Sequence, residues 1–324
     1  MIKFWFDIYR DSRASHRIRA KLIVDYAKQV NQDFDIVGPN TADKINFEKD
    51  IVIFSKDSDI ISLKKLKKCG CTVGFDLCDN KFETEQVYKD YCESADFITA
   101  NTPAMQKIIK DFTSKDSYHY ADCVERSIKP PKTSFSSKPL KLLWYGGKSS
   151  IGYMPWQKTI NDLQKNKINY QFKIVTNSSQ KFYGKALKRW RTKTDVYFDL
   201  QNIDFVEWTY DVQEEAMDWC DIIVIPVDRV INKKGDRTFT KSHNRLVDGI
   251  ASGCWVISSE LPSYKPLADF CWLGNVVDGI NFYKNNQSLV EEKISLGQQW
   301  IKNNASPEVV MQQLIEIYKD IKNE

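Results

Sequence analysis

Cationic residues gather between an aliphatic strand and the first turn of a helix in the second half of the chain. The expected strand covers residues 222–225 and stops at Pro226, and an amphipathic segment begins at residues 242–244. The free N–H groups of a helix N-terminus attract anions, and neighbouring cationic side chains strengthen that attraction. The spacing therefore predicts a diphosphate site, whose cations would be Lys233, Lys234, Arg237, Lys241 and Arg245.

A glycine pair provides a second candidate contact for phosphate. Gly146 and Gly147 end the apolar run of the segment LLWYGGKSSIG, and glycine lets a backbone approach a ligand closely. A P-loop would need glycine five residues before Gly147, where Leu142 stands, and no GxGxxG follows an expected strand. The sequence thus disfavours a nucleoside triphosphatase and an NAD or FAD enzyme. A ligand-facing loop and a simple strand-to-loop turn both stay open.

The first half of the chain offers candidates for the acceptor side of a reaction. Asp76 and Asp79 lie at or just beyond the carboxyl end of an expected strand, where they could orient or deprotonate a hydroxyl group. A turn with an aspartate cap explains them equally well. His16 follows the first expected strand as an acceptor-side candidate, or it simply begins a helix. Its basic neighbours Arg13, Arg17 and Arg19 could face phosphates or an anionic acceptor.

Strands and helices alternate along the chain, which predicts parallel sheets covered on both faces. In the first third, strands are expected at 3–8, 51–55, 72–75 and 97–100, with helices at 15–30, 60–68, 88–94 and 103–112. A segment rich in proline, serine and lysine, 126–141, reads as a linker between domains. Strands then follow at 140–145, 171–176, 203–206, 222–225 and 254–258, with helices at 156–165, 212–219 and 306–322.

The expected fold class is α/β, with two Rossmann-like doubly wound parallel-sheet domains. The first would cover residues 1–134 and the second residues 135–305, because 324 residues exceed what one core usually supports. A C-terminal helix over 306–324 could cross back to the first domain.

Composition favours a soluble, cytoplasmic protein with reduced cysteines. The net charge of +4 among 28% charged residues gives no support to a bulk nucleic-acid or membrane-surface role. Neither a signal peptide nor an apolar run of about 18 residues, as a transmembrane segment needs, is visible. A zinc site is disfavoured because the spacing lacks paired CxxC motifs in the cluster Cys69, Cys71, Cys78 and Cys92.

Residues 203–267 resemble the donor-binding half of group 1 glycosyltransferases of the GT-B fold. The shared pattern is a WCD before a strand that ends in proline, then KSHNRL at 241–246, GIASG at 249–253 and a following VISS strand. The first half matches more loosely, through SHRIRAK, FDLCDN and TANTPAM. The resemblance implies two Rossmann-like domains facing a cleft, a UDP- or GDP-sugar as donor substrate, and transfer with retention to an unidentified acceptor such as a glycan, lipid or small molecule.

The resemblance also assigns roles to individual residues. It implies catalytic roles for Lys148 and Lys241 at the diphosphate, whereas the catalytic candidate Asp76 rests on its place at the end of an expected strand. Asp248 would bind the ribose, and the segment 206–208, which contains Glu207 and Trp208, would sit beside the base. Many family members carry a glutamate where this chain has Thr240, which is a departure. The remaining donor contacts would be Gly146, Gly147, Ser242, Asn244 and Arg245. The acceptor-side candidates His16 and Asp79 come from their positions after expected strands and not from the resemblance.

Two other functions remain open at this point. The basic segments 64–68 and 185–193, the latter with Trp190, would suit a DNA-base glycosyltransferase, although nucleic acid is not the favoured partner. Thr240 would suit a non-catalytic nucleotide-sugar-binding or scaffold protein. No metal is expected, because lysines would neutralise the diphosphate and the second domain has no DxD motif placed to hold an ion. His119 and His243 have no matching catalytic partners in the sequence.

Overall fold

The computed structural model describes most of the chain. The described residues are 1–56, 58–82, 86–132, 139–147, 155–176, 202–227, 231–232, 235–236 and 240–323. Several cations that the sequence places near the phosphates lie outside these ranges, as does the whole basic segment 185–193; these cations are Lys148, Lys233, Lys234 and Arg237. None of the described helices combines the length and apolar character needed to cross a bilayer.

The first domain is built on a parallel sheet with the order β2-β1-β3-β4-β5-β6. Its strands are β1 (Ile2–Trp5), β2 (Phe34–Val37), β3 (Ile51–Phe54), β4 (Thr72–Leu77), β5 (Phe97–Ala100) and β6 (Tyr118–His119). Its helices are α1 (Ala14–His16), a π-helical turn (Arg17–Lys21), α2 (Leu22–Gln29), α3 (Ile60–Lys68), α4 (Val87–Ser94) and α5 (Pro103–Thr113).

The second domain repeats this architecture, with the sheet order β14-β13-β10-β7-β8-β9. Its strands are β7 (Leu140–Tyr145), β8 (Tyr170–Thr176), β9 (Ile203–Glu207), β10 (Ile222–Ile225), β13 (Trp255–Ser258) and β14 (Trp272–Leu273). Its helices are α7 (Trp156–Lys165), α9 (Tyr210–Trp219), α10 (Asn244–Ala251), α11 (Val276–Asn285) and α12 (Gln287–Asn304). A separate antiparallel pair consists of β11 (Ile231–Asn232) and β12 (Gly235–Asp236).

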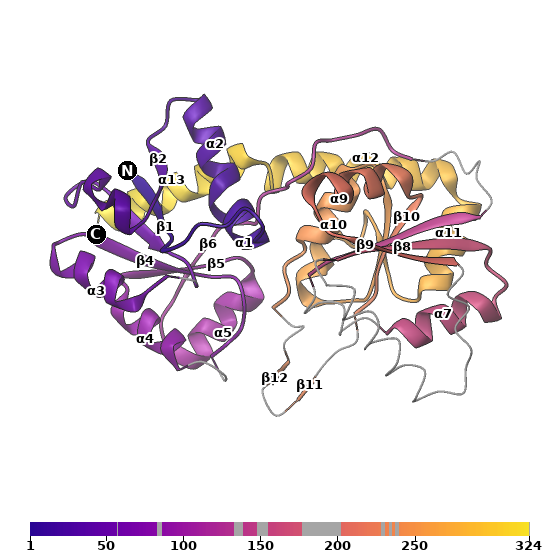
Figure 1. The fold of residues 1–324 in the computed structure, drawn as a ribbon, viewed down its shortest axis with the longest axis horizontal. Helices are drawn as coiled ribbons and strands as arrows, with labels where there is room; N and C mark the ends of the chain where they lie inside the picture. The colour runs from indigo at the N-terminus through magenta and orange to yellow at the C-terminus, as the bar shows by residue number, and fades with distance from the viewer. Residues whose placement is uncertain are drawn as a thin grey trace.

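Both sheets are covered by helices, so their central strands are buried on both faces. Strands β3 and β10 are buried at every position, as expected for continuous Ile and Val runs in parallel sheets. Each domain has two apolar clusters, one on either side of its sheet. The prediction of an α/β chain with two parallel-sheet domains is confirmed, and Figure 1 shows the two domains side by side.

The C-terminal helix α13 (Pro307–Asn323) belongs structurally to the first domain. It packs against α2, and both chain termini lie in that domain (Figure 1). Its buried face joins the apolar cluster that contains β1 and α2, through Val310, Met311 and Leu314. The side-chain oxygen of Gln313 also accepts a hydrogen bond from the backbone N–H of Ala121, at 3.0 Å. The last segment of the chain therefore completes the core of the first domain.

Some element predictions were wrong. The first strand stops at Trp5, and Ile8, expected inside it, is 62% exposed. The expected helix over 15–30 is divided by the π-helical turn. Strand β2 and helices α11 and α12 were not predicted. Both helices contain an interior glycine, which usually weakens a helical pattern. Here each glycine allows close packing: a Cβ at Gly279 would lie 2.7 Å from Trp272, and one at Gly297 would lie 2.8 Å from Phe270.

We expect Leu314→Ala in α13 to lower the free energy of unfolding by about 2–5 kcal/mol, because it opens a cavity in the first domain's core. The control is Gln312→Ala on the exposed face of the same helix, which should change stability by less than about 0.5 kcal/mol. Urea denaturation followed by circular dichroism measures both. Equal, small effects would show that α13 does not contribute to that core.

Candidate functional site

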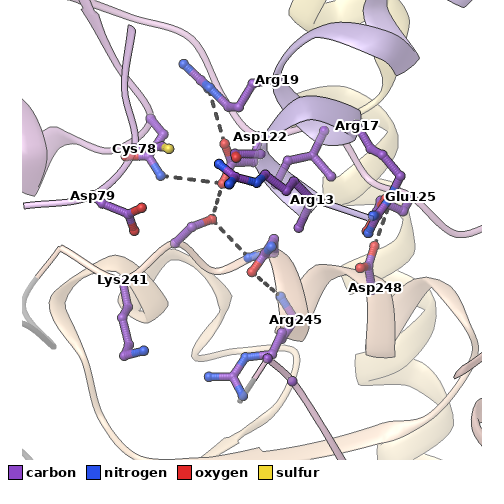
Figure 2. Close-up of a pocket in the computed structure, with 18 of the residues that line it drawn as sticks. Arg13, Arg17, Arg19, Cys78, Asp79, Asp122, Glu125, Lys241, Arg245 and Asp248 are labelled. Atoms are coloured by element: carbon purple, nitrogen blue, oxygen red, sulfur yellow. Dashed lines mark hydrogen bonds and ion pairs between the residues drawn. The ribbon is translucent and has the colours of Figure 1, made fainter. Parts of the chain in front are cut away.

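The topology places a cavity between the carboxyl ends of the two sheets. In open parallel sheets, ligands bind where the strand order reverses. The order reverses between β1 and β3 in the first domain and between β7 and β10 in the second. The loops that follow these strands line one cavity of about 690 Å³, to which both domains contribute. Figure 2 shows its charged side chains converging from the two domains.

On the second domain's side, Arg245 and Gly146 are packed directly against each other. The guanidinium Nη1 atom of Arg245 donates to the carbonyl of Tyr145 at 3.3 Å, and the Tyr145 hydroxyl donates to the Arg245 carbonyl at 2.7 Å. A Cβ at position 146 would lie 3.2 Å from Nη1 of Arg245 and 3.1 Å from the Trp144 ring. Glycine at this position therefore lets the cation lie against the end of β7. Gly147 also lines the cavity.

Lys241 lies near Arg245 in the same wall of the cavity. Burial and, to a smaller extent, the positive charge of Arg245 lower the pKa of Lys241 to about 8, while Asp79 across the cleft opposes the change. Two neighbouring cations destabilise each other, and a bound anion would relieve that repulsion. Lys241 and Arg245 thus form the part of the cavity that favours a ligand with concentrated negative charge.

The start of helix α10 differs from the expectation that its N–H groups would be presented to a diphosphate. The amide of Asn244 donates to Ser242 Oγ at 3.2 Å, and the amide of Arg245 donates to Asn244 Oδ1 at 2.8 Å. Ser242 Oγ in turn donates to the carboxylate of Asp122 in the first domain. Side chains therefore already occupy the first two amides of the helix, while Ser242 and Asn244 themselves line the cavity.

Asp248 lies one turn further along α10, at the contact between the domains. Its Oδ1 atom accepts a hydrogen bond from the backbone N–H of Glu125 at 2.9 Å. Burial raises the pKa of Asp248 to about 8, and the negative charge of Glu125 raises it as well, against the effects of Arg126 and Arg17. The Glu125 carboxylate is itself paired with Arg17, with Nε to Oε1 at 2.5 Å. The ribose-binding candidate of the sequence thus also joins the two domains.

Glu207 and Thr240, which the resemblance places at the base and the sugar, differ in whether they line the cavity. Glu207 ends β9 with an exposed side chain and is not among the described residues that line the cavity, whereas its neighbour Trp208 is. The indole Nε1 atom of Trp208 donates to Gln213 at 2.7 Å, and the guanidinium of Arg17 lies 5.3 Å from the ring centroid. Thr240 is buried and lines the cavity.

The first domain's wall of the cavity comes from residues 12–15 and 17–19 after β1 and from the loops after four further strands. Lys56 follows β3, Cys78 and Asp79 follow β4, Asn101 follows β5 and Asp122 follows β6. The Lys56 ammonium pairs with the Asp79 carboxylate. Although burial opposes its ionisation, the charge and hydrogen bond of Lys56 hold the pKa of Asp79 below its usual value. Burial raises the pKa of the Cys78 thiol to about 12, so this thiol stays protonated at neutral pH.

The structure places neither Asp76 nor His16 on this cavity, which corrects their expected exposure to a substrate. Both Asp76 oxygens pair with the buried guanidinium of Arg19, at 2.6 and 3.1 Å. His16 is only 1% exposed, its Nδ1 atom accepts from the Arg10 amide at 3.0 Å, and its ring packs on Phe6. Both side chains support the loops behind the cavity instead.

Several cavity residues were missed in the sequence. Asp122 and Glu125 follow the two-residue strand β6, which is too short to recognise from its pattern. Lys56 and Asn101 directly follow the expected strands 51–55 and 97–100. This position at the carboxyl end of a strand was the signal that could have identified them. Among the described residues that line the cavity, seven cationic side chains face four carboxyl groups, a formal excess of three positive charges. The cations are Arg13, Arg17, Arg19, Lys56, Lys81, Lys241 and Arg245, and the carboxylates are Asp79, Asp122, Glu125 and Asp248.

In the described ranges, no group of three or more His, Cys, Asp or Glu side chains is arranged so that it could hold a metal ion. All eight cysteines are free thiols.

Solved structures with the same architecture over their whole length share little sequence with this chain. A glycosyltransferase from Rickettsia africae ESF-5 superposes with a TM-score of 0.69 at 12% identity, covering 99% of this chain and 98% of its own. Sucrose-phosphate synthase from Thermosynechococcus elongatus gives 0.67 at 11% identity, with 99% of both chains covered. The chain has the GT-B fold.

A third similar structure was determined with a nucleotide. It is an α-glucosyltransferase in complex with UDP, with a TM-score of 0.63 at 10% identity over 98% of this chain and 99% of its own. At such identities the likeness concerns the fold. No protein-family model matches the sequence, and a search of the curated proteins finds no match.

The Asp248→Asn variant should be more stable than the wild-type protein at pH 8–9, and this difference should disappear toward pH 4–5. The native state raises the pKa of Asp248, so the carboxyl group favours folding when protonated, and this contribution is lost as pH rises through about 8. Asparagine cannot ionise, yet it keeps an oxygen for the Glu125 amide. Thermal denaturation across this pH range measures the difference, with Asp116→Asn, at a largely exposed position, as control. An advantage that is constant with pH would contradict the assignment.

Proposed function

We propose that this protein is a glycosyltransferase that transfers a sugar from a UDP- or GDP-sugar to an acceptor held by the first domain. One observation carries the proposal: Lys241 and Arg245 line the cavity at the strand-order reversal of a GT-B fold, within an excess of positive charge. A nucleoside diphosphate carries the complementary charge. The similar solved structures are named as glycosyltransferases or as a sugar-phosphate synthase, which supports the same class of reaction.

The chemistry follows from where negative charge develops. When the bond between the sugar and the phosphate breaks, the diphosphate leaves with increasing negative charge, and preorganised cations stabilise that transition state. Losing one such preorganised contact can cost about 3–4 kcal/mol of transition-state stabilisation. We assign this role to Lys241, Arg245 and, by the family resemblance, Lys148. Transfer is proposed to be metal-independent because these side chains supply the neutralising charge, and retention is proposed from the resemblance.

The remaining contacts complete a proposed donor site. We assign the ribose hydroxyls to Asp248, and the Trp208 ring, rather than Glu207, offers a flat surface for the base. Gly146 and Gly147 allow the phosphates to approach β7 closely. On the opposite wall, Asp79 stays ionised at neutral pH and would orient an acceptor hydroxyl by accepting its hydrogen bond.

Within the described residues, which exclude the basic segment 185–193, no specific observation favours the DNA-base alternative. The lysines of α3 point to solvent, as most basic helix faces do, and Lys67 pairs with Asp96 at 2.7 Å. A non-catalytic binding protein differs from the proposed enzyme only in turnover. Incubation with UDP- and GDP-sugars, with detection of released UDP or GDP, separates the two. Absence of binding and of turnover with every nucleotide sugar would refute the proposed donor class.

Lys241→Ala should weaken UDP or GDP binding by roughly 10- to 100-fold, the effect of removing one hydrogen bond to a charged group. Isothermal titration calorimetry with the nucleoside diphosphate measures the affinity. The matched control is Lys265→Ala, which removes the same charge from an exposed position outside the described cavity lining. Equal affinities for the two variants would place the diphosphate elsewhere.

Nucleoside-diphosphate affinity should also fall as pH rises above about 8. The depressed pKa means that Lys241 carries its positive charge below pH 8 and loses it above, so binding there requires uptake of a proton. Titrations at pH 7 and pH 9 in buffers of different ionisation enthalpy detect this uptake. Lys241→Arg should retain binding and remove most of the pH dependence, because arginine stays charged. An unchanged dependence in this variant would assign it to another group, such as Asp248.

A further inference from the structure

Two buried amide oxygens in the cavity wall have no hydrogen-bond partner among the described residues. They are the Oδ1 atoms of Asn80 and Asn101, and both residues line the cavity. Asn101 is only 1% exposed. A buried acceptor without a donor is costly, so a ligand that donates hydrogen bonds to these atoms would be favoured.

The network behind Asn101 fixes which of its amide atoms is available. Its Nδ2 atom lies 3.5 Å from the carboxylate oxygen of Asp122, toward which it donates. The same carboxylate accepts from Arg19 and from Ser242. Rotating the amide by half a turn would place Oδ1 against the negative charge of Asp122. The oxygen of Asn101 is therefore the atom left for a ligand, and the ligand must be a donor.

The surroundings of Asn80 have the same polar character. It follows Asp79, whose carboxylate pairs with Lys56 and interacts electrostatically with Lys241 across the cleft. The first domain's share of the described lining is polar or charged apart from Ala14, Ile18 and Cys78. Such a wall suits a hydrated, hydrogen-bonding group and disfavours an alkyl chain.

We propose that the first-domain wall of the cavity binds a polyhydroxylated group, a sugar or similar polyol, whose hydroxyls donate to Asn80 Oδ1 and Asn101 Oδ1. The inference rests on the proposed function and deepens it, because it names the chemistry of the group that reaches this wall. The hydroxyls come either from the sugar of the donor or from the acceptor. In both cases the two asparagines determine specificity.

The test uses Asn80→Leu and Asn101→Leu, which keep similar side-chain volume and cannot accept a hydrogen bond. The exposed Asn303→Leu in α12 is the matched control. Affinities are measured by calorimetry for UDP and GDP without a sugar, and for UDP-glucose, UDP-N-acetylglucosamine and GDP-mannose. Transfer rates are measured with methyl α-glucoside, maltose and glycerol as acceptors. Asn80 is only partly buried as a residue, so its variant remains informative if Asn101→Leu fails to fold.

We expect both variants to retain wild-type affinity for UDP or GDP. If the hydroxyls belong to the donor sugar, affinity for the nucleotide sugar should fall about 3- to 10-fold, the effect of losing one hydrogen bond. If they belong to the acceptor, donor affinity should stay unchanged while the acceptor KM rises by the same factor. Unchanged affinities and unchanged acceptor KM in a folded variant would overturn the inference, as would equal losses for UDP and UDP-glucose.

Failure of the proposed function gives a different result. In that case the wild-type protein binds no nucleotide at all, and the wild-type protein and the three variants are titrated with maltose alone by heteronuclear NMR. Shifts of cavity resonances that disappear in Asn80→Leu would sustain polyol binding without nucleotide-sugar chemistry. No shifts in the wild-type protein would overturn both proposals.

Discussion

The arrangement of the cleft depends on one buried guanidinium. Arg19 is 3% exposed, and it binds Asp76 at the end of β4 and both the Tyr120 carbonyl and Asp122 beyond β6. A buried charge without partners is strongly destabilising, so these strand ends must stay where they satisfy it. Asp122 also accepts from Ser242 in the second domain. One cation thereby fixes the loops of the first domain and connects them to the loop that carries Lys241.

The other charges in the cleft divide between structure and ligand. Arg17 and Glu125 pair with each other, and the Glu125 amide binds Asp248, so this group holds the domains together at the buried face of α10. Lys241 and Arg245 line the same wall, and burial, together with the positive charge of Arg245, lowers the pKa of Lys241. This pair, in a cavity with excess positive charge, gives the strongest physical reason to assign a diphosphate to the site.

Local pattern was enough to predict much of the fold and part of the cavity lining. Aliphatic runs such as 222–225 marked buried parallel strands, and cations before α10 marked the anion-favouring wall. The wrong expectations for Asp76 and His16 have a common cause. Whether a polar side chain faces a cavity depends on partners distant in sequence, and Asp76 meets Arg19 57 residues away. Asp122 and Glu125 were missed because strand β6 is only two residues long, and their roles arise from contacts about 120 residues apart.

The most direct test of the central claim is a crystal structure of the protein with UDP or GDP bound. We expect the diphosphate to lie in the 690 Å³ cavity, with phosphate oxygens about 3 Å from Lys241 Nζ and the Arg245 guanidinium. The ribose hydroxyls should lie near Asp248. A nucleotide bound elsewhere, or in the cavity without contact to either cation, would contradict the claim.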